Sequence, residues 1–327
     1  MSFAALLKTL MGLQKLDTGF QKNLILNQGL DYFGGGNGTD MRAHCLLGSG
    51  NSIPAPTQTS LDDFIAANNS ILAVTNSHDY DADRDGDLYK NSSTYTYQFL
   101  NLESVNISEI GLASQYGSAT EYYLCTRALI KDANGAPTTI SINEGETLQV
   151  QYKIWRVFSL IDKTGKINLT DGDGVSTEYN YTVRMAGVGG TSLGGSNSYK
   201  NDVGQVMRTN AGNAGHAIYN GSLGDFTAGP NGSSIWYAGD SRTLPIDNYV
   251  QGSYKAVIRC ALPLDAANGI IKTFLLLTSM GFFQIEYSKV SDNSGISKTT
   301  LKLLSWYLKL AGVVTRANCN VARQHTD

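Results

Sequence analysis

The C-terminal stretch from Gly269 to Leu310 constrains the fold of this chain more than any other. From residue 283 to residue 288 apolar and polar side chains alternate, which is the two-residue period of a strand with one buried face. Residues 291–295 read Ser-Asp-Asn-Ser-Gly, a run of turn-forming residues. Apolar residues alternate again between residues 300 and 310, with a change of phase near residue 303 that a bulge would explain. The pattern predicts a long β-hairpin at the core of the C-terminal half.

Short segments that are typical of strands, some of them alternating, recur through the first 160 residues. The clearest lie at residues 94–99, 107–112, 122–130, 138–142 and 148–158, and an Asn-Gly pair at 134–135 predicts a tight turn between two of them. Only 16% of the residues are charged, while glycine (35) and tyrosine (18) are numerous, as expected for strands joined by many turns. We therefore predict a mainly β chain built from antiparallel β-sandwich domains.

The N-terminus has a different period. Phe3, Leu6, Leu7 and Leu10 recur at three- and four-residue steps, which predicts a short amphipathic helix over residues 3–16. Such a helix either packs on its own domain or docks as an arm on a neighbouring subunit. The expected division is a helix or arm at 1–18, a β-sandwich domain at 19–160, and a second β domain at 161–327 with long Gly/Ser/Asn-rich loops at 186–250.

Composition argues against several classes of protein. The net charge is −3 and there is no basic tract, so no nucleic-acid partner is expected. No window of about 20 apolar residues exists, so no membrane span is expected either. The four cysteines form no CxxC pair and the four histidines are scattered, which argues against a zinc site. A Gly-x-Ser-x-Gly match at 190–194 leads into no helix and is a chance match in a glycine-rich run.

One acidic run is a candidate metal site. Asp81, Asp83 and Asp85 stand at alternate positions before Gly86, with Asp87 following, and this spacing resembles the first half of a calcium loop. The twelfth position, where such a loop has a bidentate glutamate, is Ser92. The competing interpretation is a solvated acidic turn ahead of a strand. No other cofactor is expected.

Two aromatic residues in the glycine-rich region, Trp236 and Tyr237, are candidates for stacking on a sugar. The alternative is that they pack in the core or against another subunit.

Three parts of the chain resemble a group of tailed-bacteriophage virion proteins described as tail, fibre or neck-associated components. The matching stretches are residues 23–31 (Asn-Leu-Ile-Leu-Asn-Gln-Gly-Leu-Asp) with 45–50 and 55–61; residues 107–111 with 126–140; and residues 281–287 with 300–306. Residues 186–250 carry none of the resemblance. Residues 289–298 also lack the proline-containing turn that the group usually has before its last strand.

The resemblance implies a β-rich structural subunit, not an enzyme, in a symmetric virion assembly. It would be made in the host cytoplasm, be located in the phage tail, neck or collar, and have as partners itself (as a homo-oligomer) and other virion proteins. Leu304, Trp306 and Leu308, with the N-terminal apolar residues, are the expected interface. One alternative is a fibre-tip receptor-binding module that presents Trp236 and Tyr237 to a host glycan. Another is a glycan depolymerase, although the long repetitive β-solenoid pattern of that class is absent.

Overall fold

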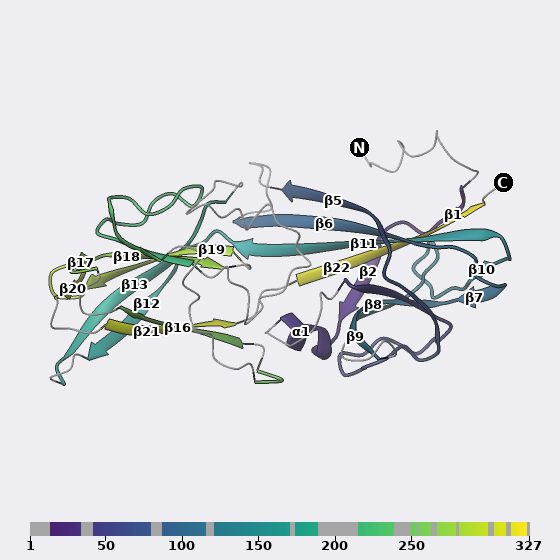
Figure 1. Ribbon diagram of the computed structural model, residues 1–327, viewed down its shortest axis with the longest axis horizontal. Helices are drawn as coiled ribbons and strands as arrows, with labels where there is room; N and C mark the ends of the chain where they lie inside the picture. Colours follow the sequence, from purple (N-terminus) through teal and green to yellow (C-terminus); the bar gives the residue numbers. More distant parts are fainter. Residues whose placement is uncertain are drawn as a thin grey trace.

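The computed structural model describes residues 14–33, 42–79, 87–115, 121–170, 174–188, 215–238, 250–253, 255–262, 267–278, 281–299, 304–311 and 315–325. Nearly every element in these ranges is a β-strand, and every strand pair is antiparallel (Figure 1). The mainly β, antiparallel class is therefore confirmed.

A 10-stranded sheet contains most of the N-terminal half. Its order is β4-β3-β8-β9-β2-β22-β11-β6-β5, and β1 also pairs with β22. The strands are β1 (Gln14–Asp17), β2 (Gln21–Ile25), β3 (His44–Gly48), β4 (Phe64–Asn68), β5 (Ile71–Asp79), β6 (Leu88–Phe99), β8 (Glu109–Gln115), β9 (Tyr122–Leu129), β11 (Glu146–Ser159) and β22 (Thr315–His325). Helix α1 (Asn27–Phe33) follows β2, and β7 (Val105–Ile107) pairs with β10 (Ile140–Ile142).

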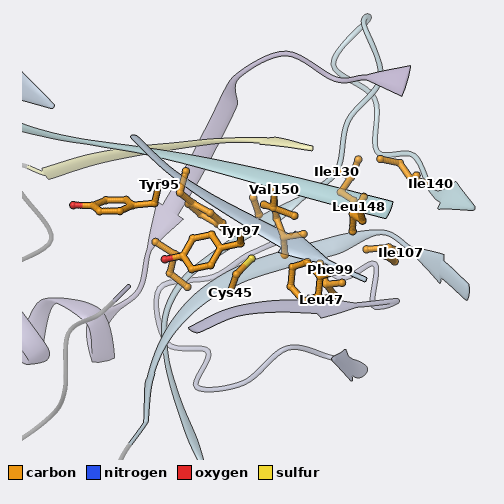
Figure 2. Close-up of a cluster of buried hydrophobic side chains, with 14 of the residues drawn as sticks. Cys45, Leu47, Tyr95, Tyr97, Phe99, Ile107, Ile130, Ile140, Leu148 and Val150 are labelled. Atoms are coloured by element: carbon orange, nitrogen blue, oxygen red, sulfur yellow. The ribbon is translucent and has the colours of Figure 1, made fainter. Parts of the chain in front are cut away.

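The largest hydrophobic core brings the two halves of this sheet together. The alternating apolar residues of β11, such as Val150 and Tyr152, are fully buried, as their period predicts. They pack with Tyr97 of the neighbouring strand β6. They also belong to the same cluster as Cys45 and Leu47 of β3, a strand in the other half of the sheet order (Figure 2). The sheet thus bends around one core instead of lying flat.

A second sheet contains much of the C-terminal half, in the order β12-β13-β19-β18-β14-β15. Two small sheets pair β16 with β21 and β17 with β20. The strands are β12 (Lys163–Thr170), β13 (Ser176–Ala186), β14 (Gly215–Tyr219), β15 (Ser234–Ala238), β16 (Lys255–Leu262), β17 (Gly269–Ile271), β18 (Thr273–Thr278), β19 (Gly281–Lys289), β20 (Ile296–Lys298) and β21 (Leu304–Ala311).

Strands β6 and β11 connect the two cores. They pair over their whole common length, from Leu148 opposite Phe99 to Ser159 opposite Leu88. At one end their side chains belong to the first core, and at the other end Tyr89 and Phe158 pack with Phe282 of the second sheet. The two long strands run along the long axis of the molecule (Figure 1).

The predicted C-terminal hairpin is wrong in its pairing. Strand β19 alternates as expected, but its hairpin partner is the preceding strand β18, with Thr278 opposite Gly281. After the turn at 291–295 the chain forms β20, which pairs with β17, and then β21, which pairs with β16. The apolar period identified strands correctly, but period alone does not specify partners.

The predicted N-terminal helix is wrong where the structure describes it, because Gln14–Asp17 is strand β1 and pairs with β22. Phe3, Leu6, Leu7 and Leu10 lie outside the described residues. Strand β11 ends at Ser159, beside the expected boundary at 160. Strand β22, however, lies between β2 and β11 in the first sheet, so this part of the expected 161–327 domain joins the N-terminal half.

Candidate functional site

A fully buried ion pair lies where β8 and β9 run side by side. Arg127 of β9 stands opposite Gly111 of β8, so its side chain shares a face of the sheet with Glu109, two residues before that glycine. The Arg127 Nε donates to Glu109 Oε2 at 2.7 Å, and both side chains are 0% exposed. Removing two charges from water is costly unless each is matched and hydrogen-bonded, so the surroundings of this pair must supply further partners.

The loop at 49–63 supplies those partners to Arg127. Its Nη1 donates to Ser52 Oγ at 3.1 Å and to Gln58 Oε1 at 2.8 Å, and its Nη2 donates to Asp62 Oδ2 at 2.7 Å. Four guanidinium N–H groups are thus used in the fork geometry that only arginine offers. Hydrogen bonds from Ser52 lower the pKa of Asp62, so this second carboxylate stays charged beside the guanidinium.

The second oxygen of Glu109 holds the loop backbone. Glu109 Oε1 accepts from the backbone N–H of Gly50 and of Asp63, each at 3.0 Å, which joins the beginning and the end of the loop to one buried carboxylate. A Cβ at Gly48 would lie 2.6 Å from the same oxygen, and a Cβ at Gly50 would overlap it. Glycine is required at both positions because the backbone approaches the carboxylate so closely.

Helix α1 covers the neighbouring part of this sheet face. Its Gly29 packs against the backbone carbonyl of Cys125, where a Cβ would overlap the oxygen. The N–H of Asn27 donates to the carbonyl of Pro56 at 2.8 Å, so the helix and the loop are also joined directly. At the other end, Asp31 accepts from the backbone N–H of Gly252 at 2.6 Å, which ties the 250–253 segment to α1. Helix, loop and strands therefore form one hydrogen-bonded unit, which we call the Arg127 network.

Five stretches on which the expected phage resemblance rests (residues 23–31, 45–50, 55–61, 107–111 and 126–140) converge here. Residues 23–31 contain most of α1. Residues 45–50 contain the beginning of the loop and residues 55–61 contain Gln58. Residues 107–111 and 126–140 supply Glu109 and Arg127. Every one of these stretches contributes at least one contact to the Arg127 network. The third part lies elsewhere: residues 281–287 are in β19 and residues 304–306 begin β21, whereas residues 300–303 lie outside the described residues.

A second loop, residues 220–233, is anchored on the other sheet in a similar way. Gln284 of β19 is fully buried; its Oε1 accepts from the N–H of Gly224 at 2.8 Å and its Nε2 donates to the carbonyl of Asp225 at 3.1 Å. Arg184 donates to the Gly224 carbonyl at 2.9 Å and forms a two-point ion pair with Asp162, at 2.8 and 2.6 Å. The hydrogen bonds from Arg184 lower the pKa of Asp162. This part of the expected 186–250 loop region is ordered by the chain's own side chains.

The predicted calcium ligands, glycan-contact residues and β21 interface residues belong to different parts of the chain. Asp81, Asp83 and Asp85 lie outside the described residues, and Asp87 is exposed just before β6. Within the described ranges, no group of three or more His, Cys, Asp or Glu side chains could hold a metal ion. Trp236 and Tyr237 are placed by backbone register in β15, opposite Ile218 and Ala217 of β14. Leu304, Trp306 and Leu308 lie in β21, opposite Leu262, Cys260 and Ile258 of β16.

The sequence did contain a signal for the Arg127 network that the patterns above missed. Glu109 and Arg127 each stand in the middle of an apolar strand, in Ile-Ser-Glu-Ile-Gly and Cys-Thr-Arg-Ala-Leu. A charge at such a position must be paired or else exposed. Two opposite charges in neighbouring predicted strands could therefore have suggested a buried pair.

Comparison of the chain with protein-family models, curated proteins and solved structures gave no match. Of the helices in the described residues, none is long and apolar enough to cross a membrane.

The Arg127 network binds the 49–63 loop to the sheet. The Glu109 oxygens and Asp62 Oδ2 each accept hydrogen bonds from the Arg127 guanidinium or from backbone N–H groups. The fold and this site define a β-rich protein whose surface loops are held in fixed shapes by buried polar side chains.

Proposed function

We propose that this chain is a non-enzymatic structural subunit of a tailed-bacteriophage virion. It forms a symmetric homo-oligomer in the tail, neck or collar and docks to neighbouring virion proteins. The observation that carries the proposal is the convergence of the phage-resembling stretches 23–31, 45–50, 55–61, 107–111 and 126–140 on the Arg127 network. These stretches are distant in sequence but meet around one buried ion pair, so they form a single structural unit, and this supports treating their resemblance as one feature.

The way in which the site uses its polar groups also supports a structural role. A buried ion pair adds little net stability compared with an apolar core, and its clearest use is to specify one arrangement. Here that arrangement is the path of the 49–63 loop, whose residues 51–53 are exposed at the surface. A subunit that binds its neighbours through the shape of its surface needs such loops to be rigid before assembly. Loops that become ordered only on binding lose conformational entropy, and that loss lowers the affinity of the contact.

The finer parts of the proposal concern domains and interfaces. We propose that the sheets form two β-sandwich domains and that residues 1–13 are a docking arm, through Phe3, Leu6, Leu7 and Leu10. Strand β21, with Leu304, Trp306 and Leu308, is the proposed second contact. Uncharged surfaces suit large interfaces of this kind, since few charges must be desolvated when two subunits meet.

Epitope tagging of phage particles tests this function. The tight turn at Asp132–Gly135 is exposed, and Gly135 adopts a φ of 82° with open space around it, so a short tag inserted after Asn134 should leave the fold intact. We expect gold-labelled antibody to mark the tail, neck or collar of particles that carry the tagged chain. Unlabelled particles, with the tagged protein found only in the host lysate, would overturn the proposal. Label at fibre tips, with binding of the purified chain to host glycan, would support the receptor-binding alternative instead.

A further inference from the structure

Strand β5 forms one edge of the 10-stranded sheet. In the part of the chain that the structure describes, it pairs with β6 alone, over Ile71–Asp79. At nine residues it is longer than β4, the five-residue strand at the opposite edge. Among the described residues no strand lies on the outer side of β5, and the backbone N–H and C=O groups of such an edge can pair with another strand.

This edge lacks the features that usually prevent strand-to-strand association. Edge strands are commonly protected by charged side chains, above all lysine, or by proline. The edge strand β12 of the other sheet follows this rule with Lys163 and Lys166, the latter 3.2 Å from Glu178. Residues 71–77 of β5 contain neither a charge nor a proline. They expose apolar surface instead, with Leu72 at 56% and Val74 at 45%.

The ladder between β5 and β6 shows where a partner strand can pair. The register shifts between Ile71 and Ala73, so Leu72 is an extra residue, and the ladder is regular from Ala73 to Asp79. A bulge disturbs the pairing of its strand. The part of the β5 edge that can pair regularly with a partner strand therefore begins after Leu72. Val74 is the exposed large apolar residue of this regular part.

We propose that β5 pairs antiparallel with β5 of a second copy of this chain, across a two-fold axis at Val74. In this register Val74 of one copy faces Val74 of the other, and Ala73 faces Thr75 of its partner copy. A two-fold interface requires a surface that is complementary to itself. An uncharged strand with a β-branched apolar residue on the axis meets this requirement, because the cross-strand valine pair is favourable and no like charges meet between residues 71 and 77. The sheets of the two copies then join into one continuous sheet.

The inference rests on the proposed function, because it names the surface through which copies of the subunit associate. The pairing itself can be measured on the purified full-length chain without particles. A chain that dimerises through β5 but is missing from particles would support the β5 contact and overturn the virion role. A chain that is found in particles but does not self-associate through β5 would do the reverse.

Charge substitution tests the contact. Val74→Lys places two lysines face to face on the axis, and we expect it to raise the dimer dissociation constant by about tenfold or more in analytical ultracentrifugation. Ile167→Lys, which adds the same charge at a 39% exposed position on the edge strand β12, is the matched control and should leave dimerisation unchanged. Circular dichroism should show that both variants are folded. A monomeric wild-type chain, or equal effects of the two variants, would overturn the proposal.

Disulfide cross-linking tests the register. On the axis the two Val74 Cα atoms lie within the reach of a disulfide, so Val74→Cys should give an oxidised dimer on a non-reducing gel above the wild-type background. In the same register the two copies of Leu72 are offset by four residues, about 13 Å along the strands, which is beyond that reach. Leu72→Cys, also exposed, is therefore the control. Cross-linking of Leu72→Cys but not Val74→Cys would overturn the proposed axis.

Discussion

The guanidinium of Arg127 and the carboxylate of Glu109 meet at 2.7 Å with both side chains fully buried. The pair joins β9 to β8, and its remaining hydrogen-bonding groups reach the 49–63 loop rather than solvent. One ion pair therefore determines how a long loop lies on a sheet.

Removing the arginine should be strongly destabilising. Arg127→Met leaves the buried carboxylate of Glu109 without its counter-charge, and breaking a buried pair in this way costs about 3–5 kcal/mol. Urea unfolding followed by circular dichroism should show that loss. Lys166→Met, which breaks the exposed Lys166–Glu178 pair, is the control and should change the free energy of unfolding by less than about 1 kcal/mol.

A double variant separates the charge from the packing. Arg127→Met with Glu109→Gln removes both charges, while the glutamine oxygen can still accept from Gly50 and Asp63. We expect the double variant to be more stable than Arg127→Met alone, because no unpaired charge remains buried. A double variant that is less stable than the single one would contradict the assignment of the loss to the orphaned carboxylate.

Gly29 offers a test of the helix contact in which two effects oppose each other. In the interior of a helix, alanine is favoured over glycine by about 1 kcal/mol. The added Cβ of Gly29→Ala, however, would overlap the backbone carbonyl of Cys125, which cannot rotate away. We predict a net loss of stability in thermal unfolding. Gly165→Ala, whose Cβ would meet the movable hydroxyl end of Tyr181, should cost less; a stabilised Gly29→Ala variant would show that α1 is not held against β9.

Period and turn chemistry predicted many of the strands, but β1 lies in the predicted helix, and β14 and β15 lie in the region predicted as long loops. The alternation at residues 148–158 corresponds to β11, and the Asn-Gly turn at 134–135 is present, with Gly135 at a positive φ. Partner choice was beyond these signals, because every apolar strand offers the same kind of buried face. Strand β19 pairs with β18, and β22 pairs with β11 of the first sheet. Neither pairing could be derived from the period.

The Arg127 network was less predictable than the strands. Its members lie as far apart as Ser52 and Arg127, and only the fold brings them together. A charge within an apolar strand indicates that some partner exists, but it does not identify Gln58 or Asp62 as that partner. The glycines at 48 and 50 are required by the close approach of Glu109, which neither period nor turn chemistry indicates.

His44 gives a pH dependence with a defined sign. Burial lowers the pKa of His44 from its ordinary value of 6.5. Below about pH 6.5 the unfolded chain therefore binds a proton that the folded chain does not, and the free energy of unfolding falls as the pH is lowered. Urea titrations between pH 7.5 and 5.5 should show a shallower decline for His44→Gln than for the wild type. Equal slopes would mean that His44 titrates alike in the folded and unfolded chain.

Gln284 should control the 220–233 loop. Gln284→Met keeps the length of the side chain but leaves the buried Gly224 N–H without this partner, at a cost of about 1–3 kcal/mol, and it also removes the hydrogen bond to the Asp225 carbonyl. Hydrogen exchange should then show faster exchange at residues 221–231, with little change in β11. Gln149→Met, at a half-buried position on β11, is the control. Unchanged exchange at Gly224 would show that the loop is held by other contacts.

Cryo-electron microscopy of the particles of a phage whose genome encodes this chain tests the proposed virion role. We expect several symmetry-related copies of this fold in the tail, neck or collar. Within each copy the 49–63 loop should follow the path set by Arg127 and Glu109. A map of the complete particle with every density assigned to other proteins would contradict the claim that this chain is a structural subunit.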